Sequence, residues 1–276
     1  MPAESIGPNE TGIDWGSQEI AEHWSRGQAR RDEVIRPATE MMLDLANLQS
    51  GNRVLDVAAG TGEQTLLAAR RVGPTGYVLA TDLSPSMLNV AAEAARKVGL
   101  TNIETRIMDA ENLDVRSESF DAVICRLGLM LFSNPPKALR GIYKALKPGG
   151  KVAALVFSTA EKNPFQAIPL GVVRRMGAAV LPMFTLGEPG VLENAFTEAG
   201  FTDVSVQAMT VQRRFPSISD LMRILRDVLF LREPMAKLRD TDREQAWTEI
   251  EQQLRRFQTP NGLELSGEFL IGVGTK

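Results

Sequence analysis

The chain has 276 residues, of which 43% are hydrophobic and 24% charged, and its formal net charge is −3. This length suffices for one large domain, or for a core with an added lid, around a buried interior. A mildly acidic chain without a basic cluster disfavours nucleic acid as the main partner. The single cysteine, Cys125, excludes an intrachain disulfide and a cysteine-based metal site. No run of about 18 apolar residues occurs, so we expect no membrane span and a cytoplasmic protein, either monomeric or homodimeric.

Residues 1–50 are expected to form an N-terminal arm and a helical cap. Residues 1–16 are rich in Pro, Gly and Asn and predict an irregular arm, whereas the pattern from 18 to about 35 predicts a helix. Pro37 suits the first turn of a second helix, because apolar residues follow it at helical spacing.

Strands and helices alternate through residues 51–158, which we expect to form the ligand-binding core. The expected strands span 53–57, 77–81, 103–107, 120–125 and 151–157. The expected helices span 63–72, 85–97 and 135–146, the last two capped by Ser84 and Asn134. Regular alternation of this kind predicts a parallel sheet that is covered by helices on both faces.

Residues 159–276 are expected to complete the sheet and to carry inserted helical segments at about 159–188 and 215–260. The remaining strands are expected at 203–211 and 263–273, with a short helix at 191–199 between the core and the first of them. Residues 158–188 are apolar but interrupted by prolines, which predicts irregular structure. Ser217 is expected to cap a helix, and Thr241 with Glu244 has the spacing of a capping box.

The inserted segments are long and apolar, which suits either ordinary packing or a lid over an apolar pocket. The tryptophans of the N-terminal cap could close the same pocket from the other side. The candidate pocket residues are Trp15, Trp24, Met183, Phe184 (which precedes Thr185), Met222 and Leu225.

The most informative stretch is the turn after the first expected strand, DVAAGTGE from Asp56 to Glu63. A strand that leads through a glycine-rich turn into a helix N-terminus forms a cradle for ligand oxygen atoms. Glycines serve there because they permit positive φ and close approach of the backbone. The alternatives are an ordinary strand-to-helix turn or a dinucleotide-binding turn. A dinucleotide fingerprint needs Gly-x-Gly-x-x-Gly, and Thr65 stands where the third glycine belongs.

This stretch resembles motif I of the class I S-adenosylmethionine (SAM) methyltransferases, an acidic residue followed by x-Gly-x-Gly-x-Gly, with Ala58 in place of the first glycine. The sequence from Asp56 to Gly62 is most similar to that of the ubiquinone/menaquinone-biosynthesis type of C-methyltransferase and its small-molecule relatives. The resemblance extends over residues 53–157. It implies an α/β, Rossmann-like fold with a seven-stranded, mostly parallel sheet, helices on both faces and a helical lid, and it implies SAM as the cofactor. The implied cofactor-binding residues are Asp56, Ala58, Gly60, Thr61, Gly62, Asp82, Leu83, Asp109, Ala110 and Arg126.

Four of these residues also stand at the expected strand ends. Asp82 ends the second strand, where a carboxylate can accept both ribose hydroxyls of a nucleoside, or can simply begin a turn. Asp109 could accept the adenine amino proton and the Ala110 N–H could bind a ring nitrogen, although polar loops favour Asp for other reasons. Arg126 follows the fourth strand, at a position whose neighbours line the cofactor in the family.

Methyl transfer from a sulfonium is an in-line displacement, so alignment and exclusion of water can supply most of the catalysis. The sole histidine, His23, is the candidate catalytic residue, as a base or as a residue that positions the acceptor. Its alternative role is packing beside Trp24. No cluster at metal-ligand spacing is present in the sequence, and no metal is expected.

We therefore expect a SAM-dependent methyltransferase that acts on carbon or oxygen of a small, largely apolar acceptor, which would be quinone-like, phenolic or a secondary metabolite. One alternative is a SAM-binding scaffold or sensor without turnover. Another is a nicotinamide-dependent oxidoreductase, which the missing third glycine disfavours. A nucleic-acid or protein methyltransferase would need a basic groove, and the charge pattern does not supply one.

Overall fold

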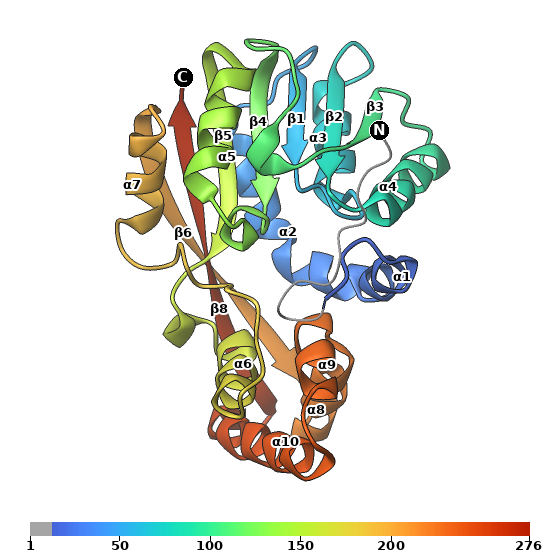
Figure 1. The fold of residues 1–276 in the computed structure, drawn as a ribbon, viewed down its shortest axis with the longest axis vertical. Coiled ribbons are helices and arrows are strands. Elements are labelled where there is room, and N and C mark those ends of the chain that lie inside the picture. Colours follow the sequence, from blue (N-terminus) through green and yellow to red (C-terminus); the bar gives the residue numbers. More distant parts are fainter. Residues whose placement is uncertain (1–12) are drawn as a thin grey trace.

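One sheet organises residues 13–276, the part of the chain that this computed structural model describes (Figure 1). Its strand order is β3-β2-β1-β4-β5-β8-β6, and the short β7 pairs with β8 beside this series. The strands are β1 (Arg53–Val57), β2 (Tyr77–Asp82), β3 (Ile103–Ile107), β4 (Phe120–Arg126), β5 (Leu146–Phe157), β6 (Thr202–Phe215), β7 (Gln258–Thr259) and β8 (Gly262–Thr275). Strands β1–β5 are parallel, whereas β8 is antiparallel to both β5 and β6. The prediction of a Rossmann-like, mostly parallel sheet is confirmed.

The central strands form because their side chains are apolar on both sides and are covered on both faces. In β1, Val54, Leu55 and Val57 are fully buried, and the strand lies between β2 and β4. Parallel strands end at the same edge of the sheet, so the turn after β1 lies beside Asp82 at the end of β2. The topology therefore brings together the residues that the sequence places at strand ends.

Helices cover both faces of this sheet (Figure 1). On one face lie α2 (Gln28–Leu45), α3 (Glu63–Val72) and α4 (Pro85–Lys97), and on the other lie α5 (Pro135–Ala145) and α7 (Val191–Glu198). The Ser84 Oγ accepts a hydrogen bond from Met87 N at 3.2 Å, and the Asn134 Oδ1 accepts one from Lys137 N at 3.0 Å. Both caps were predicted from the sequence and are confirmed.

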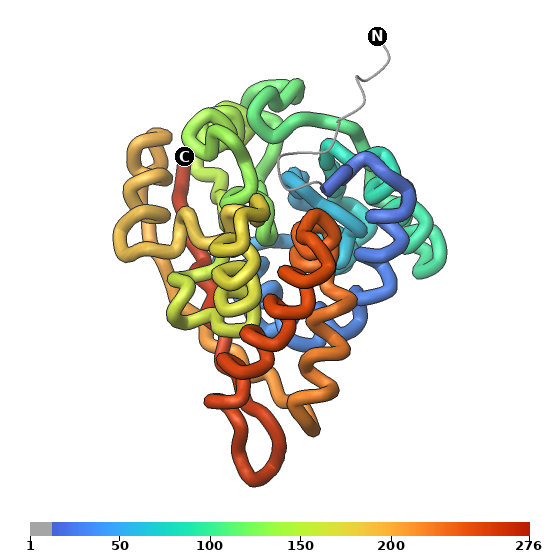
Figure 2. Tube along the Cα trace, turned by 60° about the horizontal axis from the view of Figure 1, so that its bottom comes forward, coloured from blue at the N-terminus to red at the C-terminus, as the bar shows by residue number. Residues whose placement is uncertain are grey.

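The remaining helices gather at one end of the sheet. These are α1 (Gln18–Arg26), α6 (Pro164–Arg175), α8 (Ile218–Asp227), α9 (Leu229–Ala236) and α10 (Asp240–Leu254). Strands β6 and β8 have 14 residues each and run past the ends of the parallel strands to reach α6, α8, α9 and α10. Figures 1 and 2 show these four helices as one group beyond the sheet. Short 3₁₀ helices are η1 (Ala110–Asn112), η2 (Leu129–Leu131), η3 (Ala160–Lys162) and η4 (Arg255–Phe257).

The N-terminal helices divide at a different residue from the one predicted. The break lies at Gly27, and α2 continues through Pro37 instead of beginning there. Proline removes one backbone hydrogen bond from a helix interior. The buried face of α2, which includes Met42 and Leu43, packs on the sheet and on α3, and this burial offsets the lost bond. Residues 1–12 of the predicted arm lie outside the described residues.

Residues 158–188 contain the helix α6, with Pro164 in its first turn and Pro169 inside it, which fits the helical insertion expected at about 159–188 although the prolines had indicated irregular structure there. Two other predictions were wrong. Thr241 lies inside α10, whose N-cap is Arg239, so no capping box forms. The fifth strand begins at Leu146 rather than 151, since it already pairs with Phe120 there. None of the helices within residues 13–276 is long and apolar enough to cross a membrane.

Candidate active site

A cavity of about 1150 Å³ opens between the carboxyl ends of the parallel strands and the helices of the cap. Its walls come from α1 and α2, from the turns after β1, β2 and β4, and from α6, β6, α8 and α9. The residues predicted from sequence that line it are Trp15, His23, Trp24, Ala58, Gly60, Asp82, Leu83, Asp109, Ala110, Arg126 and Met183. Those that lie outside its lining are Asp56, Thr61, Gly62, Phe184, Met222 and Leu225.

The turn after β1 follows a left-handed path at three positions. Ala58, Gly60 and Gly62 have φ of +57°, +56° and +87°. A Cβ on Gly60 would meet nothing within 4 Å, so this part of the backbone faces open space. A Cβ on Gly62 would lie 2.7 Å from the Cβ of Ala91, so Gly62 lets α3 and α4 approach closely.

Ala58 adopts this strained backbone although it carries a Cβ. Gly128, after β4, makes room for it, because a Cβ on Gly128 would lie only 2.6 Å from the Cβ of Ala58. The departure from the family's first glycine is thus accompanied by a glycine on the neighbouring loop.

Asp82 is held in place by backbone amides. Its Oδ2 accepts a hydrogen bond from Gly60 N at 2.8 Å, and its Oδ1 accepts one from Ser84 N at 2.9 Å. Burial raises the pKa of Asp82, and these N–H groups partly offset that effect. The carboxylate therefore joins the turns after β1 and β2 at the edge of the cavity. The next residue, Leu83, is 43% exposed, and its side chain also lines the cavity.

Asp56 lies beneath the turn rather than in the cavity. It is fully buried, its Oδ1 accepts from Gln64 Nε2 at 3.1 Å, and its Oδ2 accepts from Thr65 Oγ1 at 2.5 Å. Burial raises the pKa of Asp56 to about 7, although both hydrogen bonds act in the opposite direction. Asp56 thus links β1 to the first turn of α3. Because its side chain lies outside the cavity, Asp56 can affect ligand binding only by fixing the conformation of the turn.

The loop after β3 presents a second carboxylate at the cavity. Asp109 is the N-cap of η1, where its Oδ1 accepts from Glu111 N at 2.8 Å and its Oδ2 accepts from Asn112 Nδ2 at 2.5 Å. These contacts fix its side chain next to Ala110, which is buried and also lines the cavity.

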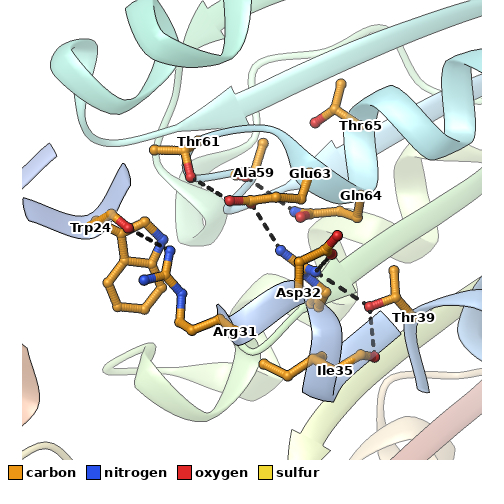
Figure 3. Close-up of polar contacts among 12 residues, drawn as sticks. Trp24, Arg31, Asp32, Ile35, Thr39, Ala59, Thr61, Glu63, Gln64 and Thr65 are labelled. Atoms are coloured by element: carbon orange, nitrogen blue, oxygen red, sulfur yellow. Dashed lines mark hydrogen bonds and ion pairs between the residues drawn. The ribbon is translucent and has the colours of Figure 1, made fainter. Parts of the chain in front are cut away.

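Arg126 takes part in a buried charge cluster that the sequence analysis did not predict. Its Nη2 lies 2.9 Å from Glu63 Oε2, and its Nη1 donates to Thr39 Oγ1 at 3.3 Å and lies 3.8 Å from Asp32 Oδ1. Figure 3 shows Glu63 and Thr61 on the turn side and Asp32 and Thr39 on the α2 side of this cluster. Thr61 Oγ1 donates to Glu63 Oε1 at 2.8 Å. Arg126 therefore fastens α2 to the start of α3, across the end of β4.

Arg31 lies close enough to this cluster for the charges of Glu63 and Arg126 to act on it. Its guanidinium lies 3.9 Å from the ring centroid of Trp24 and donates to the Trp24 carbonyl oxygen at 2.6 Å. Burial lowers the pKa of Arg31 to about 10, so the group stays charged at neutral pH. Trp15 meets Trp24 edge to face, with ring centroids 6.0 Å apart, and both rings line the cavity.

His23 joins the N-terminal cap to the inserted helices. Its Nε2 lies 2.5 Å from the Asp227 carbonyl oxygen, and its Nδ1 lies 3.2 Å from Arg26 Nη2 and 3.3 Å from Arg232 Nη1. This arrangement fits a neutral ring that donates from Nε2 and accepts at Nδ1. Both ring nitrogens are thus engaged by protein atoms.

The cap side of the cavity is lined by aromatic side chains together with polar ones. Four phenylalanines contribute to it: Phe157, Phe165, Phe215 and Phe230. Met222 and Leu225 belong instead to the buried side of α8, and Asp220, Arg223 and Ile224 of the same helix line the cavity. Phe184 packs against Phe157 with ring centroids 6.1 Å apart, behind the lining. Thr185 donates to the Met130 carbonyl oxygen at 3.3 Å.

Comparison with known proteins bears on the part of the chain that forms this turn and the first five strands. Residues 48–175 match a family model described as a methyltransferase domain. This segment is therefore similar to methyltransferase domains. It includes the turn after β1, Asp82, Asp109 and Arg126, whereas β6 lies outside it.

The chain also resembles proteins of known name. The ubiquinone/menaquinone biosynthesis C-methyltransferase UbiE of Pasteurella multocida (strain Pm70) is 38% identical over 127 residues, which are 46% of this chain and 47% of that protein. UbiE of Escherichia coli O1:K1 / APEC is 36% identical over 143 residues, 50% of this chain and 57% of that protein. The chain thus spans about half the length of the curated relatives it matches.

Solved structures share the fold over most of the chain. The YcgJ protein of Bacillus subtilis has a TM-score of 0.62 at 19% identity, over 87% of this chain and 98% of that chain. Phosphoethanolamine N-methyltransferase 2 of Haemonchus contortus, in complex with S-adenosyl-L-methionine, has a TM-score of 0.59 at 20% identity, over 94% of this chain and 57% of that chain. At these identities the likeness concerns the fold.

Proposed function

We propose that the chain is a SAM-dependent methyltransferase that transfers a methyl group to carbon or oxygen of a small acceptor. The observation that carries this proposal is the turn from Ala58 to Gly62, which meets the anchored carboxylate of Asp82 at the edge of a large cavity. The turn lies in the segment that matches a methyltransferase-domain model, and relatives that are 36% to 38% identical over about half of the chain are named C-methyltransferases.

The residues around the turn fit a nucleoside with a charged tail. Each oxygen of Asp82 accepts one backbone N–H and keeps a further acceptor site for a ribose hydroxyl. Asp109 and Ala110 would hold the adenine at the next strand end, with Leu83 against its ring. Arg31 would face the carboxylate of the methionine part.

The chain's own contribution to the reaction would be alignment and exclusion of water. Bound at this turn, SAM supplies a methyl group on a positively charged sulfur. The tryptophans of α1 and its preceding loop, together with the phenylalanines of the cap, would enclose the acceptor on the opposite side. Good alignment of two reactants removes about 7–11 kcal/mol from a barrier. A catalytic base is needed only where the acceptor carries a proton that must leave early.

The alternatives have less support. A nicotinamide-dependent oxidoreductase needs a glycine where Thr65 stands, and the Thr65 hydroxyl is bound to Asp56 beneath the turn. A nucleic-acid substrate calls for an open basic groove, whereas this cavity is lined by acids as well as by arginines.

Asp82→Ala is expected to weaken SAM binding by about 1.5–3 kcal/mol, or 10- to 150-fold, because hydrogen bonds to a charged group are lost. Isothermal titration calorimetry with SAM measures this change, and a parallel titration with NAD tests the oxidoreductase alternative. Asp114→Ala, which removes an exposed carboxylate outside the cavity lining, is the matched control and should bind as the wild type does. Equal affinity of the two variants would remove Asp82 from the site, and binding of NAD in place of SAM would overturn the proposed function.

The catalytic role of His23 stays a prediction, and its contacts favour a role in closing the cap over the cavity. General acid–base catalysis contributes about 10²–10⁴-fold to a rate. We expect His23→Gln to lower kcat by less than about tenfold, because the glutamine amide can still donate to the Asp227 carbonyl oxygen. Steady-state kinetics with an accepted substrate decides the matter. A drop of a hundredfold or more in kcat, with unchanged SAM affinity, would show that His23 is the base.

A further inference from the structure

Arg213 is a charged residue at an inward-facing position of β6. Along the end of this strand, Val211, Arg213 and Phe215 are buried and the residues between them are exposed. Its side chain is only 9% exposed and lines the cap side of the cavity. An arginine in a row of buried apolar side chains calls for a partner, because an unpaired buried charge is costly.

The protein does not provide that partner. Within residues 13–276, Arg213 makes no hydrogen bond or ion pair, and its Nη1 is completely buried without an acceptor. Its guanidinium makes a cation–π contact with Phe165, whose ring centroid lies 5.1 Å from the guanidinium carbon. Burial lowers the pKa of Arg213 to about 10, so the group remains a cation at neutral pH.

The surroundings hold this guanidinium in place. A Cβ on Gly267 of β8 would lie 2.4 Å from Arg213 Nη1, so the glycine leaves the space that the group occupies. Nearby acceptors are already used: Asn163 Oδ1 accepts from Glu268 N at 3.0 Å, and the Glu268 carboxylate pairs with Lys162 at 2.7 Å. Arg213 Nη1 faces Gly267, whereas Nε and Nη2 are not among the fully buried unpaired atoms and are available to a molecule in the cavity.

A second unpaired polar atom lies at the same end of the cavity. Gln166, on α6 next to Phe165, is 4% exposed, and its Oε1 is buried without a donor. The rings of Phe165 and Phe215 are nearly parallel, with an interplanar angle of 4° and centroids 6.0 Å apart, and Phe230 meets Phe165 edge to face. A cation, a hydrogen-bond acceptor and three aromatic rings thus line one region.

We propose that Arg213 binds an anionic oxygen group of the methyl acceptor, and that Gln166 Oε1 accepts a hydrogen bond from a hydroxyl or amino group of the same molecule. The acceptor is then an aromatic acid, which adds an anionic group to the small, largely apolar molecule expected from the sequence. This inference rests on the proposed function, since it names the substrate class of the same cavity. Arg213 acts as a specificity-determining residue.

The test uses two probes of nearly the same shape, the anionic 1-hydroxy-2-naphthoate and the neutral 1-hydroxy-2-naphthamide. Calorimetric titration of the full chain, saturated with S-adenosylhomocysteine, should show that the acid binds about tenfold tighter or more than the amide, as for a close buried ion pair. Arg213→Met should abolish this preference. Arg174→Met, which removes an exposed charge from α6 outside the cavity lining, should retain it. Equal affinity of acid and amide for the wild type, or an undiminished preference in Arg213→Met, would overturn the inference.

Two further readouts separate this inference from its alternatives. If Arg213 merely supports the fold, Arg213→Met should lower the thermal midpoint. If Arg213 instead serves to bind an anion, Arg213→Met should be at least as stable as the wild type, because the variant loses an unpaired buried charge. S-adenosylhomocysteine is titrated separately. Failure of that nucleoside to bind would count against the proposed function alone, and loss of the acid preference with intact nucleoside binding would count against the inference alone.

Discussion

Arg126→Met is expected to lower the free energy of unfolding by about 3–5 kcal/mol, the cost of breaking a buried ion pair by removing one partner. The side chains of Arg126 and Glu63 are 12% and 6% exposed, and their closest atoms are 2.9 Å apart. Burial lowers the pKa of Arg126, while the carboxylates of Glu63 and Asp56 act in the opposite direction. Without the guanidinium, the Glu63 carboxylate would stay buried with only the Thr61 hydroxyl as a donor from a side chain. Denaturation in urea at pH 7 measures the loss.

Two variants make this result interpretable. Glu63→Gln combined with Arg126→Met should recover most of the lost stability, since no unpaired charge remains. Arg106→Met breaks the pair with Glu104, whose side chains are 47% and 46% exposed, and should cost less than about 1 kcal/mol. Equal effects of Arg126→Met and Arg106→Met would mean that the buried pair contributes no more than a surface pair.

The parallel core could be predicted from the sequence because its signals are local. Helices that follow the strands begin at caps such as Ser84 and Asn134, and each cap is visible in a window of four residues. The position of Asp82 at the cavity also follows, since parallel strands end at one edge. Alternation of strands and helices is thus enough to place the strand-end side of the cavity.

The cap could not be predicted in the same way, because its signals compete with packing over long distances. Pro37 and Pro169 both lie inside helices, where the buried faces of α2 and α6 outweigh one lost hydrogen bond each. Thr241 and Glu244 have capping-box spacing, but Arg239 occupies the N-cap and holds Asp242 at 2.7 Å. The capping-box sequence at Thr241 therefore does not cap the helix, because α10 has its N-cap two residues earlier, at Arg239.

The lining of the cavity on the cap side depends on which side of each helix or strand faces inward. Met222 and Leu225 were chosen because they are apolar, yet the cavity receives Ile224 and Arg223 from the same helix. A lid helix shows its less apolar side to the cavity, because its most apolar side packs on the other cap helices. Arg213 could have been noticed from sequence as a charge within an alternating strand, at the same inward phase as Val211.

Asp56→Asn is expected to gain stability relative to the wild type as the pH rises from about 4 to about 7. Burial raises the pKa of Asp56 in the folded protein to about 7, against about 3.9 for an unfolded aspartate. Between these values the folded state holds a proton that the unfolded state has released, so the free energy of unfolding falls as the pH rises. The full difference corresponds to no more than about 4 kcal/mol. Asparagine has the same shape and no such proton, so the variant escapes this loss.

Urea denaturation of both proteins between pH 4 and pH 7.5 measures the effect as a difference, in which the other titrating groups cancel. Asp121→Asn is the matched control. Burial alone would raise the pKa of Asp121, but hydrogen bonds from Arg53 N and from Lys147 hold it below its ordinary value. Its contribution is complete above about pH 4 and is lost only as the pH falls further, so its difference curve should be flat over the measured range. A flat curve for Asp56→Asn as well would mean that Asp56 is ionised beneath the turn, with Gln64 and Thr65 bound to a carboxylate.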